Sequence, residues 1–248
     1  MRILILGGSS EATLLAKTLS QRADLDAILS LAGRTKNPAP MPLPTRSGGF
    51  GGVEGLVSYL RDERINAVID ATHPFAAQMK RNAAQACAAT NTPLCAFTRA
   101  PWVAGEGDDW IEVDSAVEAA AALGETPKKN VFLAIGRQQA GAFAGSPHHF
   151  VLRAIDAPDA EALPASLDLV LARGPFTVAD EIALMRDKKI DILVSKNAGG
   201  EATRAKIDAA RVEKLPVVMI RRPKTPERPV FENIGDALAW IEAHCPAS

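Results

Sequence analysis

The sequence predicts an α/β protein of two Rossmann-like domains, each built on a parallel sheet, with a substrate cleft between the domains. Short apolar runs of strand length alternate with longer segments of helical periodicity along nearly the whole chain. This alternation is typical of parallel strands joined by right-handed crossovers. It breaks once, between residues 99 and 113, where prolines, glycines and two tryptophans interrupt the periodicity. We therefore expect a dinucleotide-binding domain over residues 1–100, a linker over about 101–113 and a C-terminal domain over 114–248.

The expected N-terminal domain alternates strands with helices from its first residues. Arg2–Leu6 is an apolar run of strand length, and Glu11–Gln21 follows with apolar residues at helical spacing. Pro74 marks the start of a later helix, because proline suits the first helical position. The expected strands are 2–6, 27–31, 67–70 and 94–97, and the expected helices are 11–21, 53–63 and 74–89.

The same alternation restarts after the linker, which predicts a second domain of the same class. No sequence repeat relates the two halves. The expected strands are 131–135, 150–153, 167–172, 190–195 and 217–220, and the expected helices are 115–123, 138–143, 178–187, 202–213 and 235–244.

Composition excludes several classes of protein. Hydrophobic residues make up 47% of the chain, enough for a buried core, and the net charge of -1 leaves no basic surface for nucleic acid. No apolar stretch approaches the roughly 20 residues of a membrane span. Cys87, Cys95 and Cys245 show neither CxxC nor metal-ligand spacing, so we expect free thiols, no metal site and a cytoplasmic protein.

The first candidate site is the run Gly7-Gly8-Ser9-Ser10-Glu11, which follows the first strand and opens a helix. Glycines let the backbone approach a phosphate, and the helix N-terminus offers unpaired N–H donors and a favourable dipole. The run lacks the complete GxGxxG pattern. Ser9 and Ser10 therefore either contact a phosphate or simply cap the helix.

Arg34 and Thr35 stand at the end of the second expected strand. In a dinucleotide-binding fold an acid at this place binds the ribose of NAD, whereas an arginine accommodates the 2′-phosphate of NADP. No acid is present here, so the sequence favours NADPH as cofactor. The alternative is an exposed loop arginine without a ligand.

Two further segments of the first half are rich in glycine or polar residues. The run Gly48–Gly52, which includes Gly49, either passes under a bound ligand or serves as a hinge. Thr72 and His73 follow the strand at 67–70, at an edge where open α/β sheets bind ligands. Thr72 either caps the next helix or contacts the cofactor. His73 is a candidate proton donor, since imidazole titrates near neutral pH, or an ordinary residue of the helix start.

The second half places a cation beside glycine at three expected strand ends. These cations are Arg137, Arg173 and Lys196. Arginine binds carboxylates and phosphates through paired N–H groups, and lysine acts as a point charge, so the three predict an anion-binding edge. Lys206 and Arg211 are expected to be helix-surface residues instead.

Taken together, the motifs resemble the precorrin-6A reductase family, whose variant for the cobalt-containing substrate is called cobalt-precorrin-6A reductase. The matching segments occur in order and cover nearly the whole chain. They are ILGGSSEA from Ile5, GGFGG from Gly48, VIDATHPFA from Val68, AFTRAPW from Ala96, IGRQ from Ile135, ARGPF from Ala172 and VSKNAGG from Val194.

The resemblance implies a two-domain enzyme that uses NADPH to saturate one carbon–carbon double bond of the macrocycle precorrin-6A in cobalamin biosynthesis. It implies a tetrapyrrole polycarboxylate as substrate and transient contacts with neighbouring enzymes of the pathway. The implied cofactor contacts are Gly8, Ser9, Ser10, Arg34, Thr35 and Thr72. The implied substrate contacts are Gly49, Arg137, Arg173, Ser195, Asn197 and Gly199. The carbon next to the hydride acceptor needs a proton, and His73 and Lys196 are the candidate donors.

Three other functions agree with the residues when the resemblance is set aside. The first is an NADPH reductase with another polyanionic or small carbonyl substrate, although the single tyrosine, Tyr59, excludes a TyrxxxLys dyad. The second is a dinucleotide-sensing protein without catalysis. The third is a two-domain transferase whose cations bind a sugar nucleotide. The ordered motifs favour the reductase.

Overall fold

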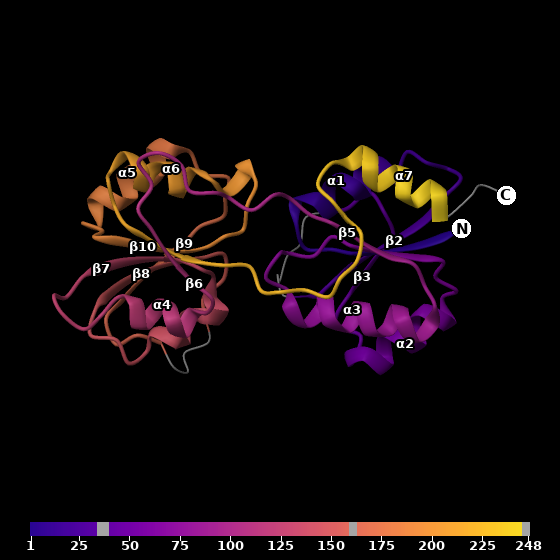
Figure 1. The fold of residues 1–248 in the computed structure, drawn as a ribbon, viewed down its shortest axis with the longest axis horizontal. Helices are drawn as coiled ribbons and strands as arrows, with labels where there is room; N and C mark the ends of the chain where they lie inside the picture. Colours follow the sequence, from indigo (N-terminus) through magenta and orange to yellow (C-terminus); the bar gives the residue numbers. More distant parts are fainter. Residues whose placement is uncertain (34–39, 159–162, 245–248) are drawn as a thin grey trace. The chain divides into compact units, whose positions relative to one another are not determined.

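The computed structural model describes residues 1–33, 40–158 and 163–244. The chain divides into two compact units, of which the first contains Met1–Ala100 and Pro223–Ser248 and the second contains Pro101–Arg222. Each unit has one six-stranded sheet in which every neighbouring pair of strands is parallel (Figure 1). The predicted class, α/β with two parallel sheets, is confirmed.

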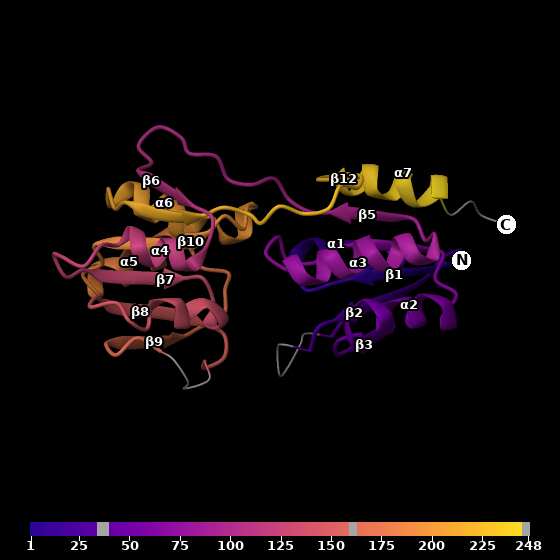
Figure 2. The ribbon, with the colours of Figure 1, turned by 60° about the horizontal axis from the view of Figure 1, so that its bottom comes forward.

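The first sheet has the strand order β12-β5-β4-β1-β2-β3 (Figure 2). Its strands are β1 (Arg2–Leu6), β2 (Asp26–Leu31), β3 (Thr45–Ser47), β4 (Ala67–Asp70), β5 (Leu94–Phe97) and β12 (Val230–Phe231). Its helices are α1 (Ser10–Leu19), α2 (Gly52–Asp62), α3 (Ala77–Thr90) and α7 (Ile234–His244).

The apolar side chains of β1 point alternately to the two faces of this sheet, and helices cover both faces. Successive side chains of a strand point to opposite faces. Ile3 and Ile5 pack in one buried cluster with α1 and α7, whereas Leu4 and Leu6 pack in another with α2 and α3. A strand buried on both faces is an uninterrupted apolar run, which is how β1 appears in the sequence.

The second sheet has the order β6-β11-β10-β7-β8-β9. Its strands are β6 (Trp110–Val113), β7 (Asn130–Ala134), β8 (His149–Ala154), β9 (Leu167–Leu171), β10 (Ile192–Lys196) and β11 (Val217–Ile220). Its α-helices are α4 (Ala116–Ala122), α5 (Val178–Asp187) and α6 (Ala205–Val212), and its 3₁₀ helices are η1 (Arg137–Phe143) and η2 (Glu201–Thr203). Phe132 and Leu193 pack against α5 and α6.

Two strands, β6 and β12, each pair in a different sheet from the strand that precedes them in the sequence. β6 follows β5 in the sequence but pairs with β11 in the second sheet, and β12 follows β11 but pairs with β5 in the first. The predicted boundaries therefore need two corrections. Residues 223–248 belong to the first unit, not to the C-terminal domain, and the expected linker at 101–113 belongs to the second unit and contains β6.

Smaller differences from the predicted elements have local causes. β3 and β12 are edge strands of only three and two residues, too short to show an alternating pattern. The helix expected from Pro74 begins only at Ala77. Residues 73–76 form a turn in which Ala76 N–H donates to His73 O and Pro74 is the second residue, so the helix starts after this turn. No helix in the described part of the chain has the length and apolarity needed to cross a membrane.

Candidate active site

The first unit brings two loops together at the carboxyl edge of its sheet. β1 and β4 are neighbours, yet β2 and β3 lie on one side of this pair and β5 and β12 on the other. Open parallel sheets bind ligands where the strand order reverses in this way. The Ser9 hydroxyl, in the loop after β1, donates a hydrogen bond of 2.7 Å to Ala71 O in the loop after β4. The fold therefore joins the predicted cofactor turn to the loop that carries Thr72 and His73.

Two glycines shape the turn from β1 into α1. A Cβ on Gly7 would lie 2.7 Å from Leu29 Cδ1, so the close approach to β2 requires glycine. Gly8 has a φ of +118°, a conformation that residues with a side chain rarely adopt. Ser9 then caps α1 by accepting a hydrogen bond from Ala12 N–H at 3.2 Å. The N–H groups of the first helical turn have no partner within the helix and suit an anion.

Ser10 belongs to a polar group that also contains Glu11 and Arg99. The Arg99 guanidinium lies 2.6 Å from the Glu11 carboxylate and donates to Ser10 Oγ at 3.2 Å. Burial raises the pKa of Glu11, but a backbone hydrogen bond, the charge of Arg99 and the hydroxyls of Ser9 and Ser10 outweigh it, so the pKa is lowered. Arg99 was not among the predicted site residues, although it follows β5 at the same edge of the sheet.

A buried ionic cluster lies at the carboxyl end of β4. Asp70 is fully buried, and its Oδ2 contacts Lys80 Nζ at 3.2 Å and the Arg228 guanidinium at 2.6 Å. Its Oδ1 accepts hydrogen bonds from the Thr72 hydroxyl at 2.6 Å and from Thr72 N–H at 3.1 Å. Arg228 comes from the segment that returns to the first unit, so the cluster fastens that segment to the strand end.

Thr72 and His73 differ in what they offer to a ligand. Thr72 is buried and its hydroxyl donates to Asp70, so it does not cap a helix; α3 has Ala76 at its cap position. His73 is half-buried, and its Nδ1 accepts a hydrogen bond from Phe75 N–H at 3.2 Å. A neutral imidazole that accepts at Nδ1 carries its proton on Nε2. Nε2 is therefore the atom from which His73 donates.

The glycine-rich loop is held by an arginine that the sequence analysis missed. Arg46 donates to Ser30 Oγ at 2.7 Å, to Gly48 O at 3.0 Å and to Gly49 O at 3.1 Å. Its guanidinium also lies 3.9 Å from the centre of the Phe50 ring. The backbone of Gly49 is thereby fixed rather than free to act as a hinge. The predicted cofactor contacts Arg34 and Thr35 lie outside the described residues.

The predicted cations of the second unit occupy different places along its sheet. Arg137 follows β7 and Lys196 ends β10, and these strands are neighbours. Both side chains are half-buried, and Arg137 donates to Ala157 O at 3.0 Å. Arg173 is exposed and follows β9, at the far edge of the sheet. Arg137 and Lys196 therefore lie at the ends of neighbouring strands, and Arg173 lies two strands away from Arg137.

Three other predicted substrate contacts are turned to the interior of the second unit. Ser195 is fully buried in β10, with its hydroxyl on Lys196 O. The Asn197 side chain accepts from Trp102 N–H and donates to Trp102 O, both at 2.8 Å. Gly199 is buried with a φ of +70°. Asn197 thus anchors the chain at Trp102, and a direct substrate contact through Ser195 or Asn197 has no support in this geometry.

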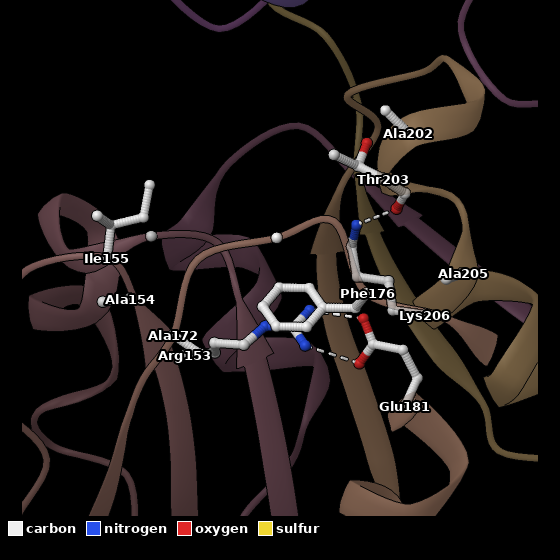
Figure 3. Close-up of a pocket in the computed structure, with 12 residues that line it drawn as sticks. Arg153, Ala154, Ile155, Ala172, Phe176, Glu181, Ala202, Thr203, Ala205 and Lys206 are labelled. Carbon is white, nitrogen blue, oxygen red and sulfur yellow. Dashed lines mark hydrogen bonds and ion pairs between the residues drawn. The ribbon is translucent and has the colours of Figure 1, made fainter. Parts of the chain in front are cut away.

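A cavity of about 230 Å³ opens at the carboxyl edge of the second sheet (Figure 3). It is lined by Gly136, Arg153, Ala154, Ile155, Ala172, Gly174, Phe176, Glu181, Ala202, Thr203, Ala205 and Lys206. Lys206, expected on a helix surface, is only 7% exposed and donates to Thr203 O at 2.6 Å. The sequence analysis missed this cavity because its residues come from four separate strand ends. The described residues contain no group of three potential metal ligands.

Comparison with known proteins decides the family. The family model described as precorrin-6x reductase CbiJ/CobK matches residues 2–242. The chain belongs to the precorrin-6x reductase family. Precorrin-6A reductase of Rhodobacter capsulatus is 49% identical over 244 residues, which cover 98% of this chain and 96% of that protein. The solved structure of CobK precorrin-6A reductase superposes with a TM-score of 0.93 at 48% identity, covering 99% of this chain and 97% of that one.

A more distant relative is the cobalt-precorrin-6A reductase of Priestia megaterium. It is 25% identical over 249 residues, which cover 95% of this chain and 96% of that protein. The resemblance inferred from the motifs is therefore confirmed at the level of the family. Membership makes this chain an oxidoreductase of the precorrin-6A reductase type.

Proposed function

We propose that this enzyme reduces one carbon–carbon double bond of precorrin-6A to give precorrin-6B, with NADPH as hydride donor, in cobalamin biosynthesis. The observation that carries the proposal is the 49% identity to a precorrin-6A reductase over nearly the whole of both chains. The turn that joins β1 to α1 supports a nucleotide cofactor on independent physical grounds.

The residues of this turn fit the diphosphate of a dinucleotide. Gly8 has the open φ of +118°, and a Cβ at this position would meet no other atom within 4 Å, so space remains beside the backbone. Ser9 and Ser10 begin α1, whose free N–H groups and dipole favour a phosphate. The nicotinamide supplies the hydride when bound, and the protein's task is to orient it and to exclude competing reactions.

Arg34 is proposed to select NADPH over NADH by binding the 2′-phosphate. Arg34→Ala should then raise the Kd for NADPH by about tenfold to a hundredfold, because a charge-assisted hydrogen bond contributes about 1.5–3 kcal/mol. The Kd for NADH should change little. Nicotinamide fluorescence measures both constants. Arg61→Ala, which removes an exposed arginine from α2, is the matched control. Equal loss of affinity for both nucleotides would exclude the selective role.

The substrate is proposed to be a tetrapyrrole polycarboxylate. Arg137 and Lys196, on neighbouring strands, supply positive charge for its carboxylates. After hydride addition the adjacent carbon needs a proton. The Lys196 ammonium is the proposed proton donor, because its N–H groups can release a proton to the carbon. His73 is proposed to assist this step by donating a hydrogen bond from Nε2, since a neutral imidazole holds that proton rather than giving it up.

We further propose that the macrocycle is the cobalt-free form. The chain is 49% identical to a precorrin-6A reductase and 25% identical to a cobalt-precorrin-6A reductase over similar lengths, which favours the cobalt-free substrate. The test is to mix the purified protein with NADPH and either macrocycle, and to follow nicotinamide absorbance and tetrapyrrole mass. We expect NADPH consumption and a gain of two hydrogens with precorrin-6A. Turnover of the cobalt form alone would reverse the assignment, and turnover of neither would refute the reductase.

A further inference from the structure

The cavity of the second unit is built for part of a larger ligand. Its volume of about 230 Å³ lies below the range of roughly 300–1,000 Å³ that is typical of pockets enclosing a whole drug-sized molecule. It spans the carboxyl ends of β7, β8 and β9 and the start of α6. A macrocycle is much larger than this space, so only one edge or ring of it can enter.

An ion pair forms the floor of this cavity. Arg153 contacts Glu181 through two parallel hydrogen bonds of 2.9 and 2.7 Å, and the side chains are 12% and 2% exposed. Each partner satisfies the other, so neither needs a ligand of opposite charge. The floor is therefore rigid and close to neutral.

The aromatic ring of Phe176 packs against this ion pair. The Arg153 guanidinium lies 3.8 Å from the centre of the Phe176 ring, a cation–π contact, as Figure 3 shows. Phe176 is half-buried and lines the cavity, so the ion pair positions an aromatic surface inside it. The small apolar residues Ala154, Ala172 and Ala205 also line the cavity, and Thr203 and Lys206 add polar atoms on one side. Such a slot suits a flat, weakly polar ring.

Two arginines are sequence neighbours of residues that line the cavity. Gly136 lines the cavity and directly precedes Arg137, and Ala172 and Gly174 line it on either side of Arg173. A Cβ on Gly136 would meet nothing within 4 Å, so open space lies beside the backbone there. Arginine carries the charge that carboxylate substituents require, so a ring with acidic side chains suits this part of the second unit.

We propose that Phe176 is the contact surface for one pyrrole-derived ring of the substrate, which enters this cavity while its carboxylates stay outside it. This inference rests on the proposed function, since it takes the tetrapyrrole as the ligand. The competing occupant is the adenine of the cofactor, which is also flat. The second unit lacks the glycine–serine turn that fits the diphosphate in the first, and this difference favours the tetrapyrrole.

The test compares Phe176→Leu, which keeps apolar volume but removes the ring, with Phe176→Trp, which keeps a flat surface. Binding of precorrin-6A is titrated by its absorbance without cofactor, and binding of NADPH is titrated by fluorescence. We expect the Leu variant to bind precorrin-6A at least about fivefold more weakly, because stacking of a flat ring on an aromatic side chain is typically worth this factor or more. We expect the Trp variant to retain most of the affinity, and NADPH binding to be unchanged in both.

Val117→Ala is the matched control, because it removes an exposed apolar side chain of α4 in the same unit. Unchanged binding of precorrin-6A to the Leu variant would overturn the inference. Loss of NADPH affinity instead would assign the cavity to adenine. A lower thermal stability together with an equal loss of affinity for precorrin-6A and NADPH, which the Trp variant does not restore, would show that Phe176 has only a structural role. Failure of the proposed function is distinguishable, because the wild-type protein itself would then fail to bind or reduce precorrin-6A.

Discussion

Asp70→Asn should lower the free energy of unfolding by about 3–5 kcal/mol, the cost typical of removing one partner from a buried ionic contact. The substitution keeps the shape of the side chain but removes the negative charge that Lys80 and Arg228 contact. Both cations are about 5% exposed in their side chains, so water cannot replace the carboxylate. Urea unfolding followed by circular dichroism measures the change.

The same substitution should also reduce activity, because Asp70 fixes Thr72 and hence the loop that carries His73. Glu213→Gln is the control: it breaks an ion pair with Arg186 whose arginine side chain is 69% exposed, and exposed pairs contribute little. A loss of stability for Asp70→Asn no larger than that for Glu213→Gln would show that the cluster does not stabilise the first unit.

Gly55→Ala should destabilise the first unit by about 1–3 kcal/mol or more, the usual cost of overpacking. Helix propensity alone predicts the opposite, since alanine is favoured over glycine by about 1 kcal/mol inside a helix. Gly55 lies in α2, where an added Cβ would be 1.7 Å from Phe50 O. The atom is backbone, so it cannot rotate away, and the loop that contains Gly49 must move.

This displacement gives Gly55→Ala a second readout besides stability. Arg46 bonds the carbonyls of Gly48 and Gly49, and movement of the loop should break these contacts and raise the KM for precorrin-6A. Gly145→Ala is the control, because no atom lies within 4 Å of its added Cβ and its φ is ordinary. Increased stability of Gly55→Ala would show that the loop adapts at no cost.

Most of the fold was predictable because it depends on local patterns. The apolar run of β1 and the helical spacing of α1 are properties of adjacent residues. The place of β12 and α7 in the first unit was not predictable in this way. It depends on pairing with β5, more than 100 residues away in the sequence, and β12 itself has only two residues.

The site was predictable where glycine or strand ends mark it, and not where distant side chains meet. The turn at Gly7 and Gly8 was found because strained backbone requires glycine. The contact of Asp70 with Arg228 joins residues 158 apart, and nothing in the sequence pairs them. Ser195 is one of the substrate contacts that the family resemblance implies. Its side chain instead points into the core, a direction set by the alternation of β10.

The most direct test of the central claim is the fate of the hydride. The enzyme is incubated with precorrin-6A and NADPH that carries deuterium in both positions at C4 of the nicotinamide, and the tetrapyrrole product is analysed by mass spectrometry. Direct transfer predicts a product that has gained one deuterium from the cofactor and one proton from the protein or solvent. A product that gains two ordinary hydrogens while NADPH is oxidised, or no reduced product at all, would contradict the assignment of this chain as an NADPH-dependent precorrin-6A reductase.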